Sequence, residues 1–255
     1  MYFTLALFLS SLLSTSRARD IPANIRKFYD GVLVQGDCRN KLATGLYSWP
    51  SSPPEWSYCG DHLADHQVIY IQGPGGLYTN MDIDCDGVQR QPNSGRCGNN
   101  TSDQAQTAFR KEVAGYGRGV DDLDPYVHPF VVFGNSGTQP HNVPFRPQEY
   151  GIEPLSVMAV VCPDKLVYAV WGDTQGGERD ASFVGEASLA LGELCYGEDG
   201  AVGGGVSHES NDVMYIAFTG PDAVPGADGA AWDARNKEEF EESIAALGDK
   251  LIQRI

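Results

Sequence analysis

Residues 155–173 read LSVMAVVCPDKLVYAVWGD, and this stretch decides the kind of fold that the chain adopts. Two apolar runs rich in β-branched residues flank PDK at 163–165, a pattern that predicts a strand, a tight turn and a second strand. Residues 174–177, TQGG, follow as a glycine-rich loop. We therefore expect Asp173 at the exposed end of a buried strand, a position where functional side chains are often presented.

The next motif outward is 183–195, FVGEASLALGELC, in which Glu186 follows Gly185 as the next ordered element begins. We expect Asp173 and Glu186 to emerge at the rim of one sheet. Two carboxyl groups across a cleft are the minimal equipment for hydrolysing a glycosidic bond. On spacing alone each residue also fits a structural role, Asp173 in a turn and Glu186 beside a helix dipole.

Six stretches carry a resemblance to a known family. Two contain these acidic residues, and the other four are spread over the chain: VYAVWGDTQGG (167–177), FVGEASLALGE (183–193), DIPANIRKFYDGV (20–32), YTNMDIDCDG (78–87), DPYVHPFVVFGN (124–135) and GIEPLSVMAVVC (151–162). Together they resemble the fungal chitosanases of glycoside hydrolase family 75. Where the loop of that family carries Asn this chain has Gln175, a change that leaves both carboxyl groups in place.

The resemblance implies endo-hydrolysis of the β-1,4 bonds of chitosan with inversion at the anomeric carbon. By motif, the base is Asp173 and the acid is Glu186. An exposed Asp173 would stay ionised and activate water, whereas Glu186 must carry a proton. If Glu186 lies in the first turn of a helix, the helix dipole stabilises its carboxylate form and opposes that role.

Residues 82–87, DIDCDG, form a second acidic cluster. If this stretch is a strand, Asp82, Asp84 and Asp86 share one face, and given the resemblance we expect them to bind the ammonium groups of chitosan in a groove. The stretch also matches the opening of an EF-hand loop, but its twelfth position is Asn93, so calcium is the lesser alternative. An ordinary solvated acidic face is a further alternative.

Trp171 is the remaining candidate for substrate binding. It precedes Asp173 by two residues, so the two side chains share a face in a regular strand. The indole is a candidate platform for sugar stacking, and a place in the core is an equally good interpretation of a Trp in an apolar strand.

The charge of the chain restricts its partners. Its 18 basic and 34 acidic residues give a net charge of −16, which argues against nucleic acid and anionic membranes as partners. A polycation such as chitosan would be attracted. Many secreted proteins are acidic merely for solubility, so the charge alone names no substrate.

The first residues have the pattern of a secretory signal. Residues 1–18 are apolar over 2–13 and end in Ser-Arg-Ala, as at a cleavage site. We expect a signal peptide over 1–18, a catalytic domain over 19–255, and an extracellular, monomeric protein. The apolar run is too short to span a membrane, and no later segment approaches the required length.

The cysteines predict disulfides rather than a metal site. Six cysteines in a secreted chain suggest three bridges, whose pairing the sequence leaves open. Among the five histidines, His62 and His66 form the one close pair, with no CxxC or HExxH motif. For this pair a surface or core role is favoured over metal binding, and we expect no metal or cofactor.

The expected architecture is β-rich α+β, a single domain built as a small β-barrel with helices packed around it, a double-psi-like arrangement being one form. Strands are predicted near 67–72, 127–133, 157–162, 166–171 and 213–219, and helices over 21–33 and 236–255. Two alternative functions stay open. One is an inverting, endoglucanase-like hydrolase of another glycan, and the other is a non-catalytic polysaccharide-binding or calcium-dependent lectin-like protein.

Overall fold

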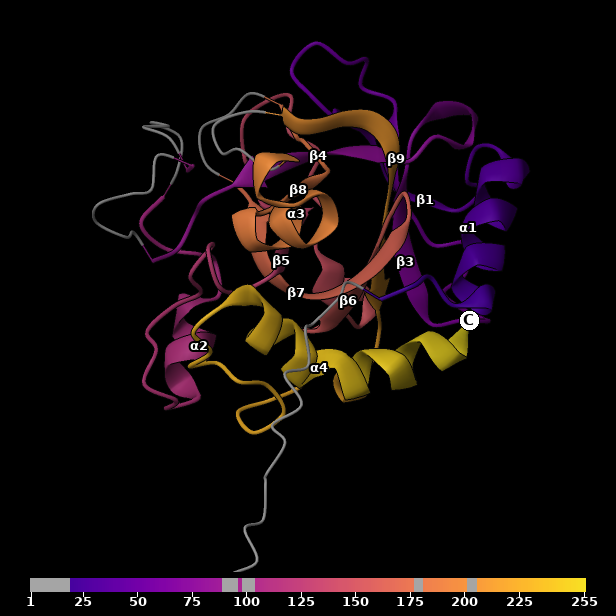
Figure 1. Ribbon diagram of the computed structural model, residues 1–255. Coiled ribbons are helices and arrows are strands. Elements are labelled where there is room, and N and C mark those ends of the chain that lie inside the picture. The colour runs from indigo at the N-terminus through magenta and orange to yellow at the C-terminus, as the bar shows by residue number, and fades with distance from the viewer. Residues whose placement is uncertain (1–18, 89–95, 98–103, 177–180, 201–205) are drawn as a thin grey trace, which may run out of the picture.

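The computed structural model describes residues 19–88, 96–97, 104–176, 181–200 and 206–255 as a mixed sheet with helices packed on it (Figure 1). The expected signal peptide lies outside these described residues. The strands are β1 (Lys41–Leu46), β2 (Trp56–Cys59), β3 (Val68–Gln72), β4 (Thr79–Asp84), β5 (Phe130–Asn135), β6 (Val157–Cys162), β7 (Lys165–Gln175), β8 (Glu186–Ser188) and β9 (Val206–Phe218). The α-helices are α1 (Ala23–Gln35), α2 (Arg110–Gly115), α3 (Leu189–Tyr196) and α4 (Lys237–Leu251). Short 3-10 helices are η1 (Pro74–Gly76), η2 (Pro147–Tyr150), η3 (Glu198–Gly200), η4 (Pro221–Ala223) and η5 (Ile252–Arg254).

The hairpin of β6 and β7 forms where the sequence predicts it. Val161 pairs with Leu166 and Cys162 with Lys165, which leaves Pro163 and Asp164 as the turn. All side chains of β6 are buried, because this strand lies between β7 and β9. Strand β7 continues to Gln175, so the expectation of a loop from residue 174 is wrong for its first two residues.

The sheet closes on itself through β9. Its order is β1-β2-β3-β9-β4-β8-β5-β7-β6, and β6 also pairs with β9. The pairings of β9, β4, β8, β5, β7 and β6 therefore form a circuit. Strand β9 joins both ends because it is long: Val213 pairs with Thr79 of β4, and Ile216 further along pairs with Ala159 of β6. The expected β-rich α+β class is confirmed, and β1 to β3 extend the circuit as an antiparallel wing.

Helix α1 covers the wing, at the right of Figure 1. It buries Ile25, Phe28 and Val32 on one face. Leu33, near the end of the helix, is 41% exposed. Asn24 donates a hydrogen bond to the Ile252 carbonyl oxygen at 2.7 Å and so ties α1 to the C-terminal η5.

Helix α4 packs against β6 and β7, below them in Figure 1. Asn236 caps it by accepting a hydrogen bond from the Glu239 amide at 2.9 Å, and Phe240, Ile244 and Leu251 are buried. The predicted C-terminal helix is therefore confirmed over Lys237–Leu251, and its last turn is the 3-10 helix η5 rather than the expected α-helix. Among the described residues, no helix combines the length and apolar character needed to span a bilayer.

Three disulfides link the six cysteines, as the even count predicts. They join Cys38 to Cys59, Cys85 to Cys97 and Cys162 to Cys195. The first bridge holds the end of α1 on β2, and the third holds α3 on β6. The second fixes the segment directly after β4, between Asp84 and Asp86 of the acidic cluster.

Candidate active site

Asp173 is buried inside the sheet. The residue is 4% exposed and lies within β7, where it pairs with Val132 of β5. Its Oδ1 accepts hydrogen bonds from the amides of Thr174 at 2.7 Å and Ala108 at 2.9 Å. The expectation of an exposed Asp173 at a strand end is therefore wrong, because β7 continues past it and the backbone at Ala108 lies over it.

Glu186 begins the short strand β8. Gly185 precedes it with a φ of +93°, and a Cβ there would lie 3.0 Å from the Asn80 carbonyl oxygen, so glycine is needed for β8 to approach β4. Helix α3 begins only at Leu189, capped by Ser188, which accepts a hydrogen bond from the Leu191 amide. Glu186 therefore lies in a strand rather than in the first helical turn, and the opposing effect of the helix dipole does not arise.

The sheet places the two carboxyl-bearing residues in one row. Strand β5 lies between β8 and β7, and Val131 of β5 pairs with Ala187 of β8. Since β5 and β8 are antiparallel, one step along brings Glu186 opposite Val132, which also pairs with Asp173. Paired residues lie side by side, so both acidic residues flank Val132, and β7 has a shift of register with β5 just before Asp173.

Of the three Asp residues of the acidic cluster, one lies beside Glu186 and the other two lie near Asp173. Asp82 pairs with Glu186 across the parallel strands β4 and β8, and its Oδ1 accepts a hydrogen bond from Asn80 at 2.9 Å. Asp84 and Asp86 instead approach Asp173, since one carboxylate oxygen of each of the three lies within 4.8 Å of the others. Strands β4 and β7 are not neighbours, so this meeting requires the sheet to curl strongly.

Each carboxyl group of the Asp84, Asp86 and Asp173 cluster is held by backbone amides. The Asp86 amide donates to Asp84 Oδ1 at 3.1 Å, and the Gln104 amide donates to Asp86 Oδ1 at 2.6 Å. Asp84 Oδ2 is buried and has no hydrogen-bond partner, although the residue as a whole is partly exposed. The cluster therefore brings three carboxyl groups together where water is scarce.

Burial and mutual repulsion raise the proton affinity of this cluster. Burial, with smaller contributions from Asp86 and Glu186, raises the pKa of Asp173 to about 8, against the lowering effect of its two amide hydrogen bonds. Burial also raises the pKa of Asp84 well above its usual range, and Asp86, Asp173 and Glu186 add to the effect. In the free protein the cluster therefore holds protons at neutral pH.

Trp171 belongs to the core. The residue is 1% exposed, its Nε1 donates to the Asp173 carbonyl oxygen at 2.8 Å, and its ring meets Phe109 edge to face at 4.8 Å between centroids. No ring face is open for a sugar, so the expected stacking platform is wrong and the alternative of a core residue holds. Trp171 instead fixes the backbone that carries Asp173.

The EF-hand alternative does not fit the structure. In such a loop Asp82, Asp84 and Asp86 would be the first three ligands of one turn. Here Asp82 and Asp84 lie in the extended strand β4, and Asp82 is not among the three carboxyl groups that converge. Asn93, at the twelfth position, lies outside the described residues. Asp84, Asp86 and Asp173 have the spacing to hold a cation together, a different arrangement from the one that the motif suggests.

Two polar residues near the row were not predicted as site residues. The Asn80 side chain, 1% exposed as a residue, bonds to Ser48 and orients Asp82. Gln175 accepts a hydrogen bond from the Phe183 amide through Oε1, while its Nε2 is buried without a partner. The position of Gln175 two residues beyond Asp173 was visible in the sequence, but its burial was not.

Comparison with known proteins identifies the family of this chain. The profile of the fungal chitosanases of glycosyl hydrolase group 75 matches residues 81–254, which contain the acidic cluster and both acidic motifs. The chain belongs to this family. The resemblance seen in the motifs is thereby confirmed.

Individual fungal proteins match most of the chain, two of them over nearly its whole length. Endo-chitosanase B of Aspergillus oryzae (strain ATCC 42149 / RIB 40) is 44% identical over 243 residues, which are 95% of this chain and 94% of that protein. An endo-chitosanase of Aspergillus fumigatus has the same identity and coverage. Endo-chitosanase C of Aspergillus oryzae is 29% identical over 180 residues, 68% of this chain and 38% of that protein.

Proposed function

We propose that this protein is a secreted endo-chitosanase that hydrolyses β-1,4 bonds between glucosamine units, with Asp173 as the base and Glu186 as the acid. The observation that carries the proposal is the row of Glu186, Val132 and Asp173 across three strands in a member of the family 75 chitosanases. Glycoside hydrolysis needs two carboxyl groups on opposite sides of the scissile bond, and this row supplies them.

The spacing of the row supports inversion. Asp173 and Glu186 lie on strands two spacings apart, about 9.5 Å in a flat sheet, and the curl of this sheet and the length of the side chains then set the separation of the carboxyl groups. Inverting enzymes hold their carboxyl groups about 6.5–9.5 Å apart so that a water fits beside the anomeric carbon. Retaining enzymes need about 5–5.5 Å, which neighbouring strands would provide more readily. In the proposed reaction Asp173 takes a proton from the attacking water while Glu186 protonates the leaving oxygen.

The base must lose its proton when substrate binds. With a pKa of about 8, Asp173 is protonated in the free protein at mildly acidic pH. Chitosan brings ammonium groups, and a cation beside buried carboxyl groups favours their ionised form. Binding of a glucosamine unit next to Asp84 and Asp86 would therefore release a proton from the cluster and leave Asp173 as a carboxylate.

The same charges support the choice of substrate. Asp82 lies beside Glu186 and Asp84 beside Asp173, so acidic side chains accompany both ends of the row. Together with the net charge of −16, they would attract a polycation and disfavour neutral or anionic polymers. We assign substrate binding to Asp82, Asp84 and Asp86, and a supporting role to Trp171.

We also propose a barrel architecture and an extracellular location for this protein. The circuit of β9, β4, β8, β5, β7 and β6 supports a small six-stranded barrel with a double-psi-like arrangement. Three disulfides support an oxidising, extracellular environment, in agreement with the signal peptide expected over 1–18. We propose a monomer that acts without a partner protein.

Release of reducing ends from chitosan tests the function. The full chain should release reducing ends from chitosan and far fewer from cellulose. Release from cellulose with none from chitosan would support the other glycan hydrolase. Binding to chitosan without release from either polymer would support a non-catalytic polysaccharide-binding protein.

A further inference from the structure

A single turn between β2 and β3 gathers three side chains with metal-binding atoms. The His66 amide donates to the His62 carbonyl oxygen at 3.1 Å, which makes one helical turn, and Gln67 ends it with a φ of +57°. In such a turn, side chains three and four residues apart share a face. His62, Asp65 and His66 therefore project to the same side.

The three donor groups converge on a small volume. One ligand atom from each of the three residues lies within 4.8 Å of the other two. Asp65 Oδ2 accepts a hydrogen bond from His62 Nδ1 at 3.0 Å, a hydrogen that a bound metal would replace, and lies 3.7 Å from His66 Nε2. Ligands about 2.0–2.1 Å from a tetrahedral zinc ion are about 3.4 Å from one another, so small movements of the side chains would bring these atoms to that spacing.

The second nitrogen of His66 is already engaged. His66 Nδ1 lies 2.7 Å from the Arg254 carbonyl oxygen, so Nδ1 carries the hydrogen and Nε2 presents a lone pair. Histidines that bind metals usually donate their other ring nitrogen in this way, which fixes the ring and its tautomer. The 3.7 Å separation of His66 Nε2 from Asp65 is too long for a hydrogen bond, so direct pairing does not explain their approach.

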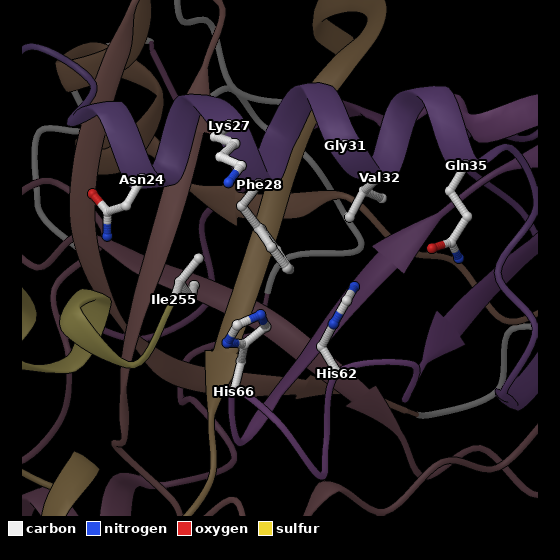
Figure 2. Close-up of a pocket in the computed structure, with 9 residues that line it drawn as sticks. All are labelled: Asn24, Lys27, Phe28, Gly31, Val32, Gln35, His62, His66 and Ile255. Carbon is white, nitrogen blue, oxygen red and sulfur yellow. The ribbon is translucent and has the colours of Figure 1, made fainter.

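The turn opens into a cavity beneath α1. The cavity has a volume of about 480 Å³ and is lined by both histidines, by Phe28 and by Lys27. Figure 2 shows His62 and His66 rising from one side toward α1, with Phe28 pointing down between them. The Phe28 ring meets the two imidazoles edge to face at 5.0 and 5.8 Å between centroids, which holds both rings in place.

We propose that His62, Asp65 and His66 bind a divalent transition-metal ion, with zinc the best fit. Two imidazoles and one carboxylate suit zinc and disfavour calcium, which takes oxygen ligands. The remaining coordination positions face the cavity and would be filled by water. The site lies on the β1 to β3 wing, so the bound ion stabilises the contact of this turn with η5 and does not take part in hydrolysis.

Zinc binding by the metal-stripped full chain tests the proposal. Isothermal titration should give one strong site, and His66→Gln and Asp65→Asn should each weaken it at least about tenfold. His141→Gln, at an exposed histidine, is the matched control and should leave the affinity unchanged. Zinc should also raise the melting temperature of the wild type and of His141→Gln, but not that of His66→Gln.

Three results would overturn the zinc site. One is the absence of a strong site in the wild type. Another is an affinity that survives both His66→Gln and Asp65→Asn. The third is loss of binding in Asp84→Asn, which would assign the ion to the acidic cluster. Asp65 is exposed and its change to Asn is nearly isosteric, so this variant remains informative if His66→Gln folds poorly.

Discussion

Asp173 and Glu186 stand on either side of Val132, on the two strands that flank β5. Val132 is 6% exposed and pairs directly with Asp173, and the register of β5 with β8 brings Glu186 opposite it. The separation of the two acidic residues is therefore set by the sheet itself and not by loops. Paired strands hold catalytic side chains more rigidly than loops do.

Nearly isosteric amide substitutions should separate catalysis from folding. Asp173→Asn removes the proposed base and Glu186→Gln the proposed acid, so each should lower kcat about 10²- to 10⁴-fold. Binding of chitosan should persist because neither change leaves a cavity. Steady-state kinetics with chitosan oligomers and a binding measurement on each variant check this expectation.

Controls for these variants come from exposed carboxyl groups. Asp30→Asn on α1 and Glu153→Gln should leave kcat within about twofold, as expected for surface sites without a role in the reaction. Glu193 is unsuitable as a control, since it is buried and forms ion pairs with Arg96 and Lys237. If Asp173→Asn or Glu186→Gln kept more than about a tenth of wild-type kcat, that residue would have to be removed from the mechanism.

The stability of the protein should fall as pH rises from about 4 to 8. Asp173 keeps its proton in the folded state up to a pKa of about 8, whereas the unfolded chain releases it near the ordinary value of 3.8. The folded state therefore binds more protons between these values, and raising the pH favours unfolding. Thermal melts at pH 5 and pH 8 should show this loss, and Asp173→Asn should reduce it. An equal slope in the variant would contradict the raised pKa.

Asp84→Asn should stabilise the protein while weakening its hold on chitosan. Asp84 Oδ2 is buried without a partner, and burial raises the pKa of this carboxyl, so at pH 7 the folded state bears the cost of keeping a proton that the unfolded chain releases; an amide carries no such cost. We expect the melting temperature at pH 7 to rise by at least about 2 °C and KM for chitosan to increase. A lower melting temperature with unchanged KM would mean that Asp84 is a structural acceptor only.

Local patterns explain why much of the fold was predictable from the sequence. The β6–β7 hairpin and helix α4 are specified by their own periodicity and capping, and both form as expected. Strand β8 has three residues, too few to show an alternation of apolar and polar positions. Strand β1 has two shifts of register with β2 and a mostly solvent-accessible pattern, so neither strand had a readable signal.

The sequence motifs named the acidic residues of the candidate site but did not reveal their environment. The motifs identified Asp173 and Glu186, which lie near each other because β7 and β8 both pair with β5. The burial of Asp173 depends on the backbone at Ala108, and the approach of Asp84 to Asp173 depends on the curl of the sheet. Neither relationship is encoded by nearby residues, so the sequence implied an exposed, ionised Asp173 and left Trp171 open between a sugar platform and a place in the core.

Binding of chitosan should release a proton from the acidic cluster. The inactive variant Glu186→Gln retains Asp84, Asp86 and Asp173, so a chitosan oligomer can be titrated into it without turnover. At mildly acidic pH, where the sugar amines are already charged, calorimetry in buffers of different ionisation enthalpy should report release of about one proton. The same titration of Asp173→Asn should report clearly less, and equal values would remove Asp173 as the source.

The anomeric form of the first product tests the row of Glu186, Val132 and Asp173 most directly. Two strand spacings leave room for a water between Asp173 and the anomeric carbon, so attack comes from the face opposite the leaving group. Cleavage of a β-1,4 bond in a chitosan oligomer should therefore yield the α-anomer first, followed by its slow equilibration with the β-anomer. Proton NMR during the first turnovers distinguishes the two. An initial β-anomer would require a covalent intermediate and would overturn the role of Asp173 as a base.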